Sequence, residues 1–147
     1  MKQHSKTALT LSTLMFSLIL ISNTSAVEAT AKSISLKGIM QSLLSDTQKI
    51  TEGIFLDNFQ MIEKAANNIA THPEIPKPIK MKLMKSFGPK MVDFKAYDTL
   101  VHNAAVEINK AAKEKDRETI LKQYQQMISD CQSCHNKFKV TVQQILK

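Results

Sequence analysis

Beyond residue 32 the apolar residues recur at intervals of three and four positions, and this spacing constrains the fold of the chain most strongly. Side chains at these intervals share one face of an α-helix, whereas a half-buried strand alternates apolar and polar residues. Four segments show the helical period: about 33–52, 55–69, from after Pro89 to Lys113–Lys115, and from Asp116 to the last turns of the chain. The spacing therefore predicts an all-α fold, an antiparallel four-helix bundle of about 115 residues.

Local signals set the expected boundaries of these helices. Gly53 is expected to stop the first helix, because glycine favours the position just after a helix end. Asp116 is expected to cap the amino end of the last helix. Three prolines, Pro73, Pro76 and Pro78, predict a long connection in the middle of the chain, since proline lacks an amide proton. Within this connection, residues 80–87 are expected to form one or two loose turns.

The amino-terminal segment is typical of a secretory signal. Lys2 and Lys6 precede an uncharged apolar run at residues 8–21, which is short for a membrane span of about 20 residues. Small residues follow, and cleavage is expected after Ala26, with Ala29 as the next choice. The predicted division is a signal peptide at 1–26 and a bundle domain at 27–147, exported to the periplasm. An uncleaved anchor helix is the alternative, and it too places the folded part outside the cytoplasm.

The composition narrows the classes of function. Cleavage after Ala26 removes two lysines and no acidic residue, which lowers the formal charge from +7 to +5. A basic surface steers a protein toward acidic partners, although a solvated lysine surface with no dedicated partner explains the charge equally well. The sequence lacks the basic motif with interleaved aromatic residues that would indicate nucleic-acid binding. The sequence has no recognisable catalytic motif of an enzyme: neither a nucleophile with a base, nor paired carboxylates, nor a phosphate-binding loop.

The motif that carries chemistry is CQSCH at residues 131–135. Its spacing is typical of c-type haem attachment, in which the two thiols bind the porphyrin and the histidine binds the iron. On a helix, Cys131, Cys134 and His135 lie on neighbouring positions of one face. A disulfide is a poor alternative at this helical spacing, and a thioredoxin-like pair needs strands that the pattern lacks. A zinc site needs four ligands, and the other candidates are His72 and His102.

The chain resembles the class II c-type cytochromes, the cytochrome c′ family, and the four-helix b-type cytochromes of the same superfamily. The residues that carry the resemblance are Cys131–Lys139, Met91–Phe94 and Ile39–Met40. The resemblance extends over the whole mature chain and implies one covalent haem c in the last helix. The family has an arginine four residues after the ligating histidine, and this chain has Lys139, which lacks the planar fork of arginine. The resemblance leaves open whether two copies pair through their first two helices.

Only twelve residues follow His135, so the group on the opposite side of the iron must come from upstream. In low-spin relatives a methionine of the first helix binds the iron, and Met40 is the matching residue. Met40 also falls on the expected inward stripe of that helix, formed by Leu36, Met40, Leu43, Thr47 and Ile50. The alternative is that Met40 only fills the core, as methionine commonly does.

The occupant of this sixth position separates the functions that remain open. Ligation by His135 and Met40 implies a one-electron carrier, because methionine opposite histidine favours reduced iron. An open position implies a five-coordinate protein that binds nitric oxide or carbon monoxide. A haem-bearing subunit of a larger respiratory assembly is the third hypothesis. His72, at a helix end, and His102, beside the third stripe, are both expected at the surface rather than on the iron.

Overall fold

The computed structural model describes residues 35–147 of the chain. The predicted signal peptide at 1–26 and its cleavage site lie outside these residues. Within residues 35–147, no helix has both the length and the apolar character needed to cross a membrane.

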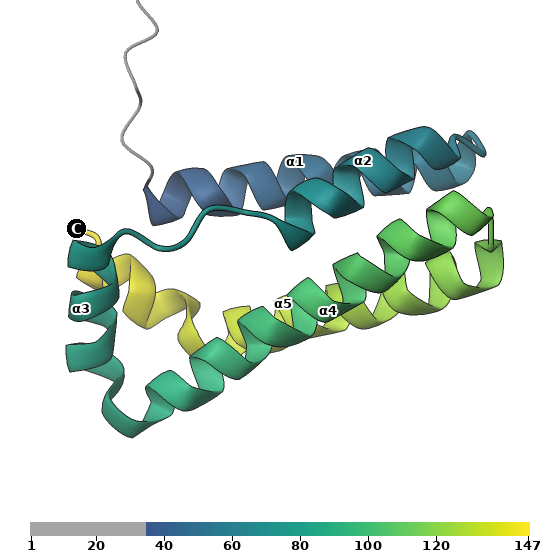
Figure 1. Ribbon diagram of the computed structural model, residues 1–147. Coiled ribbons are helices and arrows are strands. Elements are labelled where there is room, and N and C mark those ends of the chain that lie inside the picture. The colour runs from purple at the N-terminus through teal and green to yellow at the C-terminus, as the bar shows by residue number, and fades with distance from the viewer. Residues whose placement is uncertain (1–34) are drawn as a thin grey trace, which may run out of the picture. The chain divides into compact units, whose positions relative to one another are not determined.

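The predicted all-α fold is confirmed: the described chain is an antiparallel four-helix bundle with one additional short helix (Figure 1). Helices α1 and α2 form one hairpin, and α4 and α5 form the other. Helix α3 and a 3₁₀ turn, η1, connect the two hairpins. The bounds are α1 Leu36–Phe55, α2 Phe59–Ala70, α3 Lys77–Phe87, η1 Gly88–Lys90, α4 Met91–Glu114 and α5 Arg117–Ile145.

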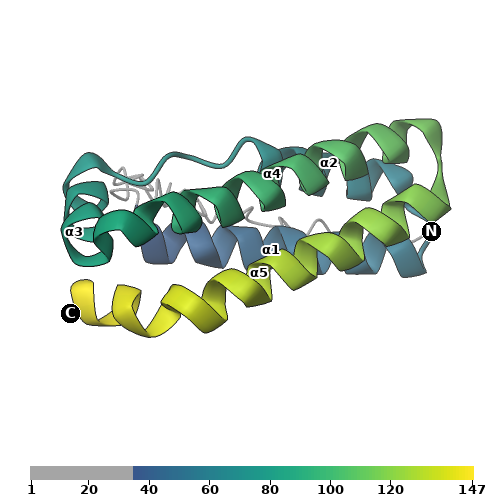
Figure 2. The same ribbon diagram turned by 90° about the horizontal axis from the view of Figure 1, so that it is seen from below.

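The two hairpins have different ends. In Figure 1 their ribbons approach each other at the α4–α5 turn and diverge toward α3. Seen from below in Figure 2, α3 and the carboxyl terminus lie at the same end of the bundle. The opposite end carries the α1–α2 and α4–α5 connections. These are called the α3 end and the turn end below.

Polar side chains begin three of the helices. Ser35 Oγ, Asn58 Oδ1 and Asp116 Oδ1 each accept a hydrogen bond from the backbone amide three residues ahead, over 3.0, 3.0 and 3.1 Å. Such caps satisfy amides that have no partner within the helix. The predicted cap at Asp116 is confirmed. The Thr119 hydroxyl also donates to its carboxylate, over 2.6 Å, and lowers the pKa of Asp116.

The prediction that Gly53 stops the first helix is wrong. Helix α1 continues to Phe55, and Gly53 is buried inside it. A Cβ atom at this position would lie 2.6 Å from Cγ1 of Ile62 on α2. Glycine is therefore required by the close approach of two helices rather than by a turn. The second helix accordingly begins at Phe59, four residues later than the apolar pattern indicated.

The prediction of loose turns at residues 80–87 is also wrong, because these residues belong to the 11-residue helix α3. Pro78 lies in its first turn, where a missing amide proton costs no helical hydrogen bond. Leu83 and Phe87 are one helical turn apart and are both buried. This short apolar stripe anchors α3 across the end of the bundle.

The core consists of two clusters. The turn-end cluster is aliphatic, rich in alanine, and joins α1, α2, α4 and α5; its buried members are Ile50, Ile62, Ala65, Ala66, Ile69, Ala104, Ala105, Ile108, Ala111, Ala112, Ile120 and Met127. The α3-end cluster is mostly aromatic, and its buried members are Leu36, Leu83, Phe87, Phe94 and Phe138. We call the level between the two clusters the junction.

Candidate haem site

The CQSCH motif lies on α5 at the junction. Cys131 is half-buried against the turn-end cluster, and Cys134, one turn later, is half-buried against the α3-end cluster. Phe138, one further turn along, is a buried member of the α3-end cluster. The two thiols therefore mark the level at which the apolar core changes from one cluster to the other.

Both cysteines are free thiols in the described structure. Burial, and then the charge of Asp130, raises the pKa of Cys131. Burial, and then the charges of Cys131 and Asp98, raises the pKa of Cys134 to about 11. Both groups are therefore neutral at pH 7, whereas reactive redox cysteines have depressed pKa values. A thioredoxin-like pair follows a strand, whereas residues 35–147 contain helices and no strand.

His135 follows the two cysteines on the exposed side of α5. Two residues later, Lys137 donates a hydrogen bond to Asp93 Oδ2 over 2.6 Å and so joins α5 to the start of α4. The same hydrogen bond raises the pKa of Lys137. Lys139, which replaces the arginine typical of the family, is exposed. The imidazole of His135 is thus exposed. The part of α5 that carries it is held by the packed cysteines before it and by the Lys137–Asp93 hydrogen bond after it.

The inward stripe expected for α1 differs from the structure at Met40, where the preceding residue is the buried one. Ile39 is buried, whereas Met40 has 39% of its surface exposed and lies at the edge of the inward face. Leu36 and Ile50 are buried as expected. The sequence pattern could not separate these two registers, because Ile39 and Met40 are both apolar. Ligation of iron by Met40 remains a prediction.

One side-chain contact fixes the register of α1 against α5. The Thr51 and Tyr124 hydroxyls form a hydrogen bond of 2.5 Å. Met40 lies eleven residues before Thr51, and His135 lies eleven residues after Tyr124. Eleven residues are about three helical turns, so each pair lies on one face of its own helix. Because α1 and α5 run antiparallel, Met40 and His135 lie at about the same level along the bundle, and both side chains are exposed.

His72 is partly buried, whereas the sequence-based expectation placed it at the surface. Its side chain is only 17% exposed, and its Nε2 atom lies 3.4 Å from Oδ1 of Asp98 on α4. It lines a cavity of about 250 Å³ together with Ile39 and Leu43 of α1. His102, in contrast, is exposed on α4 as expected. Sequence reasoning missed the pairing of His72 with Asp98, since 26 residues and a helix separate them.

The residues at the junction fit a covalently attached haem. Two neutral thiols one turn apart face the interior, and an accessible imidazole follows them. Side chains of the two clusters flank the site with apolar surface: Leu43, Val101 and Tyr124 on one side and Tyr97 and Phe94 on the other. No group of three or more His, Cys, Asp or Glu side chains in residues 35–147 could hold a metal ion.

Comparison with known families gives one match. A model of the family described as Cytochrome C′ matches residues 35–139, which is more than half of the chain and includes α1, the junction and the motif. No curated protein and no solved structure matches the chain.

Proposed function

The chain belongs to the cytochrome c′ family and is thus a haem-binding c-type cytochrome; from this premise we propose that it carries one electron at a time in the periplasm. The proposal has four parts. One haem is attached through Cys131 and Cys134. His135 and Met40 are its axial ligands. The protein acts as a carrier and not as an enzyme, and its redox partner is acidic.

Covalent attachment is supported by the state of the thiols. Addition of each thiol to a vinyl group needs a free cysteine that faces the porphyrin, and Cys131 and Cys134 are free and half-buried toward the core. Their helical spacing of three positions brings both to one side of α5.

The observation that carries the choice of an electron carrier is the register of α1 against α5. The bond between Thr51 and Tyr124 supports a placement of Met40 opposite His135, three turns away on both helices. Haem iron supplies the redox chemistry, and the two side chains tune it, because histidine with methionine raises the reduction potential. A filled coordination sphere also excludes small gases from the iron.

The exposure of Met40 favours a second candidate. Met40 has 39% of its surface exposed, so the bundle does not enclose it. If it stays off the iron, the site is five-coordinate and binds nitric oxide or carbon monoxide. This gas-binding protein shares the fold and the covalent haem with the carrier, so only the sixth position separates the two functions.

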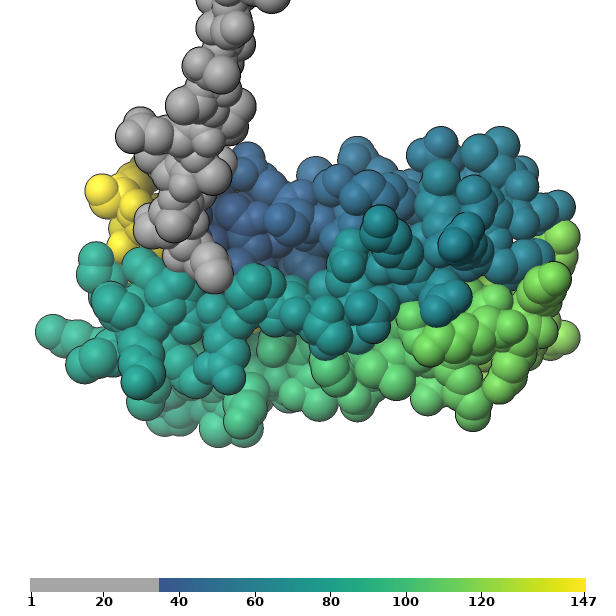
Figure 3. Space-filling view, turned by 45° about the horizontal axis from the view of Figure 1, so that its top comes forward, coloured from purple at the N-terminus to yellow at the C-terminus, as the bar shows by residue number. Residues whose placement is uncertain are grey.

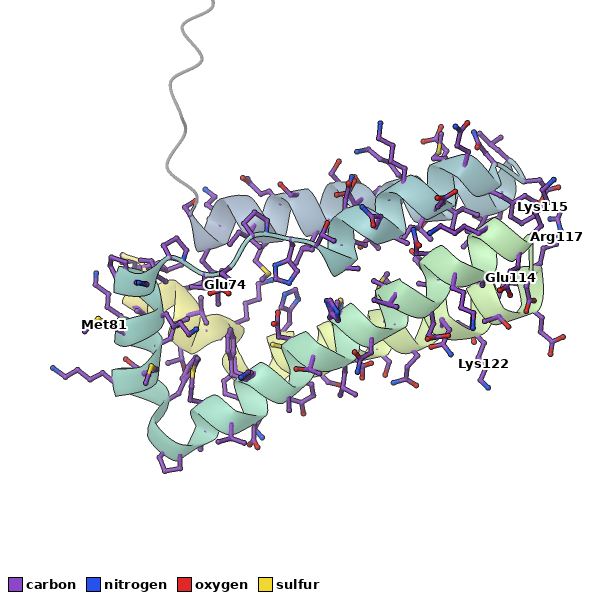
Figure 4. The ribbon with its side chains drawn as sticks, viewed as in Figure 1. Glu74, Met81, Glu114, Lys115, Arg117 and Lys122 are labelled. Atoms are coloured by element: carbon purple, nitrogen blue, oxygen red, sulfur yellow. The ribbon has the colours of Figure 1, made fainter. Side chains whose placement is uncertain are left out.

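An acidic redox partner is supported by the surface of α3. From residue 75 to residue 92 the chain has no acidic residue and five lysines, namely Lys77, Lys80, Lys82, Lys85 and Lys90. Met81 and Met84 are 70% and 53% exposed on the same helix. In Figure 3 side chains of α3, in teal, project from this end of the molecule. Figure 4 shows that the opposite end carries both charges, where Glu114, Lys115, Arg117 and Lys122 are labelled.

The charge of α3 can be tested with a small anionic oxidant. Oxidation of the ferrous protein by ferricyanide should slow in the double variant Lys80→Gln/Lys85→Gln, and the difference should shrink as salt screens the charges. The control is Lys115→Gln/Lys122→Gln, which removes the same charge at the turn end. Equal rates for the two double variants would contradict a role of α3 in guiding the encounter.

Absorption in the near-infrared tests the axial ligands directly. The ferric protein should show the weak band that reports sulfur bonded to iron, and the ferrous protein should bind carbon monoxide slowly or not at all. Met40→Ala should abolish the band, whereas Met84→Ala, a change at an exposed methionine of α3, should leave it intact. A high-spin ferric protein without the band, which binds carbon monoxide readily when reduced, would exclude the carrier and favour the gas-binding protein.

A further inference from the structure

The two sides of α3 differ in chemistry. Its inner side carries Leu83 and Phe87, which are both buried in the α3-end cluster. Residues two positions apart lie nearly opposite each other on a helix, so Met81 faces away from Leu83. Figure 1 shows that α3 lies across the end of the bundle, and Figure 4 labels Met81 on the side away from the other helices. The outer side of α3 is therefore an end surface of the molecule.

The lysines of this end surface have no acidic partners. Residues 75–92 contain five lysines and no acidic residue. In the part of the chain that the structure describes, none of these five lysines forms an ion pair. Asp93, the first acidic residue after the segment, is already bonded to Lys137. At the turn end, in contrast, Arg117 pairs with Asp57. The positive charge of α3 is thus available to an anionic partner.

Apolar side chains are exposed among these lysines. Met81 and Met84 are 70% and 53% exposed on α3, and Val92, in the first turn of α4, is 75% exposed. Burial of apolar surface away from water is favourable in proportion to its area. Exposed apolar groups that gather on one surface mark sites of interaction. The α3 end therefore combines unpaired positive charge with apolar groups that a partner can cover.

The residue types of this surface suit a lipid bilayer better than a protein. Interfaces between proteins are enriched in aromatic residues and arginine and depleted in lysine. Residues 75–92 contain no arginine, and their one aromatic residue, Phe87, is buried. Lysine side chains keep their charged heads at the level of lipid phosphates while their stems lie along apolar surface. A helix with lysines and apolar groups on its outer side is typical of segments that lie in a membrane interface.

We propose that the outer side of α3 docks on an anionic phospholipid bilayer, with the helix parallel to the membrane surface and the bundle pointing away from it. Met81 and Met84 enter the interface, and the lysines contact lipid phosphates. This inference goes beyond the proposed function, which needs only long-range attraction between the lysines and an acidic partner. It does not depend on the haem.

The turn end gives a comparison within the same molecule. Phe55 and Leu56 are 84% and 63% exposed there, so exposed apolar surface by itself does not distinguish the α3 end. The distinction is the charge, because anionic lipids repel carboxylates. The acidic residues of the turn end are Glu52, Asp57, Glu114, Asp116 and Glu118.

Flotation with vesicles tests the proposal. Holoprotein without residues 1–26 is used, so that the apolar run at 8–21 cannot contribute to binding. The vesicles consist of phosphatidylcholine alone or of phosphatidylcholine and phosphatidylglycerol in equal parts. The protein should float with the mixed vesicles and not with phosphatidylcholine alone, and added salt should weaken the binding.

Two double variants separate apolar contact from charge. Met81→Gln/Met84→Gln keeps the charge, and it should raise the dissociation constant on the order of tenfold, because the amides do not favour the apolar side of the interface. Lys80→Gln/Lys85→Gln should raise it by about 30-fold, through the loss of two cations at an anionic surface. All four side chains are exposed, so the haem absorption and circular dichroism of both variants should match those of the unmutated protein.

The control is Phe55→Gln/Leu56→Gln, which removes exposed apolar surface at the turn end and should keep the affinity of the unmutated protein. The proposal is overturned if the protein does not float with the mixed vesicles, or if it floats equally with phosphatidylcholine alone. It is also overturned if the methionine variant binds as tightly as the unmutated protein, a result that would leave the lysines as a guide for acidic proteins. None of these measurements involves the iron ligands, so a failure here leaves the proposed carrier as it stands.

Discussion

The two ends of the bundle are built differently. At the turn end, a continuous aliphatic core joins all four long helices, and Arg117 at the start of α5 pairs with Asp57 of the α1–α2 connection and lies 5.2 Å from the centre of the Phe59 ring. At the α3 end the core consists of three mutually packed phenylalanines, Phe87, Phe94 and Phe138, whose ring centres are 4.9–5.4 Å apart. Helix α2 contributes no buried residue to this second cluster.

The difference separates the part of the bundle that holds the four helices together from the level at which we propose the haem. The turn-end cluster brings four helices together on its own, through alanines that let the helices approach closely. The α3-end cluster closes the opposite end with aromatic rings and a short helix. The motif is located between them, where the core is interrupted. The aliphatic core at the turn end therefore stabilises the bundle, and the proposed haem site lies at another level of the same helices.

The largest expected effect follows from removing the cofactor. In Cys131→Ala/Cys134→Ala protein prepared without haem, amides of α3 and of residues 134–145 should lose most of their protection against hydrogen exchange. Amides of residues 104–112 should retain theirs, because the turn-end cluster does not depend on the cofactor. Hydrogen exchange followed by mass spectrometry measures both regions at once. A uniform loss of protection would show that the two ends are one cooperative unit.

The next effect is a cavity in the turn-end cluster. Ile108 is fully buried, and Ile108→Ala should lower the free energy of unfolding by about 2–5 kcal/mol, since it leaves a cavity in a packed core. Leu121, which is 46% exposed, is the control, and Leu121→Ala should change the same quantity by about 0.5 kcal/mol or less. Guanidinium unfolding followed by circular dichroism measures both. Similar losses would mean that this end is loosely packed.

A smaller effect tests the close approach of α1 and α2. Gly53→Ala places a Cβ atom 2.6 Å from Ile62, and it should destabilise the protein by about 1–3 kcal/mol through overpacking. Gly38→Ala, in the first turns of the same helix, meets only Ser35 Oγ at 3.2 Å and should change stability by less than about 1 kcal/mol. A Gly53→Ala protein as stable as Gly38→Ala would show that the two helices are free to separate.

The smallest effect concerns the cap of α5. Hydrogen bonds from Thr119 lower the pKa of Asp116 in the folded protein below its ordinary value of 3.8. The carboxylate therefore stabilises the fold above that ordinary value, and this contribution is lost as the pH falls through the lower, folded-state pKa. Asp116→Asn should flatten that part of the dependence of unfolding on pH. If the free energy of unfolding of the variant falls at acidic pH just as it does in the unmutated protein, other carboxylates cause the decrease.

The amino-acid sequence predicted the parts of this fold that depend on local chemistry. The helical period indicated the four long helices, and the Asp116 side chain indicated the start of the last one. The spacing of Cys131 and Cys134 predicts a haem site, because two thiols and a histidine at this spacing have few other uses. The match to the cytochrome c′ family supports haem binding, and attachment at these two residues stays a prediction.

The errors have a common cause in contacts between distant segments. A glycine such as Gly53 is favoured both just after a helix end and where two helices approach closely. Only the contact with Ile62 shows which of the two applies. Ile39 and Met40 are both apolar, so the inward register of α1 depends on its partners. His72 is partly buried and lies 3.4 Å from Asp98 of α4, a pairing that no periodicity encodes.

The central claim is that haem is covalently attached at the junction, and digestion of the holoprotein after acid-acetone treatment tests it most directly. The colour should stay with the polypeptide, and mass spectrometry should find the haem on the tryptic peptide that contains both Cys131 and Cys134. Colour in the organic phase, or a peptide with two unmodified cysteines from protein that contains haem, would contradict it.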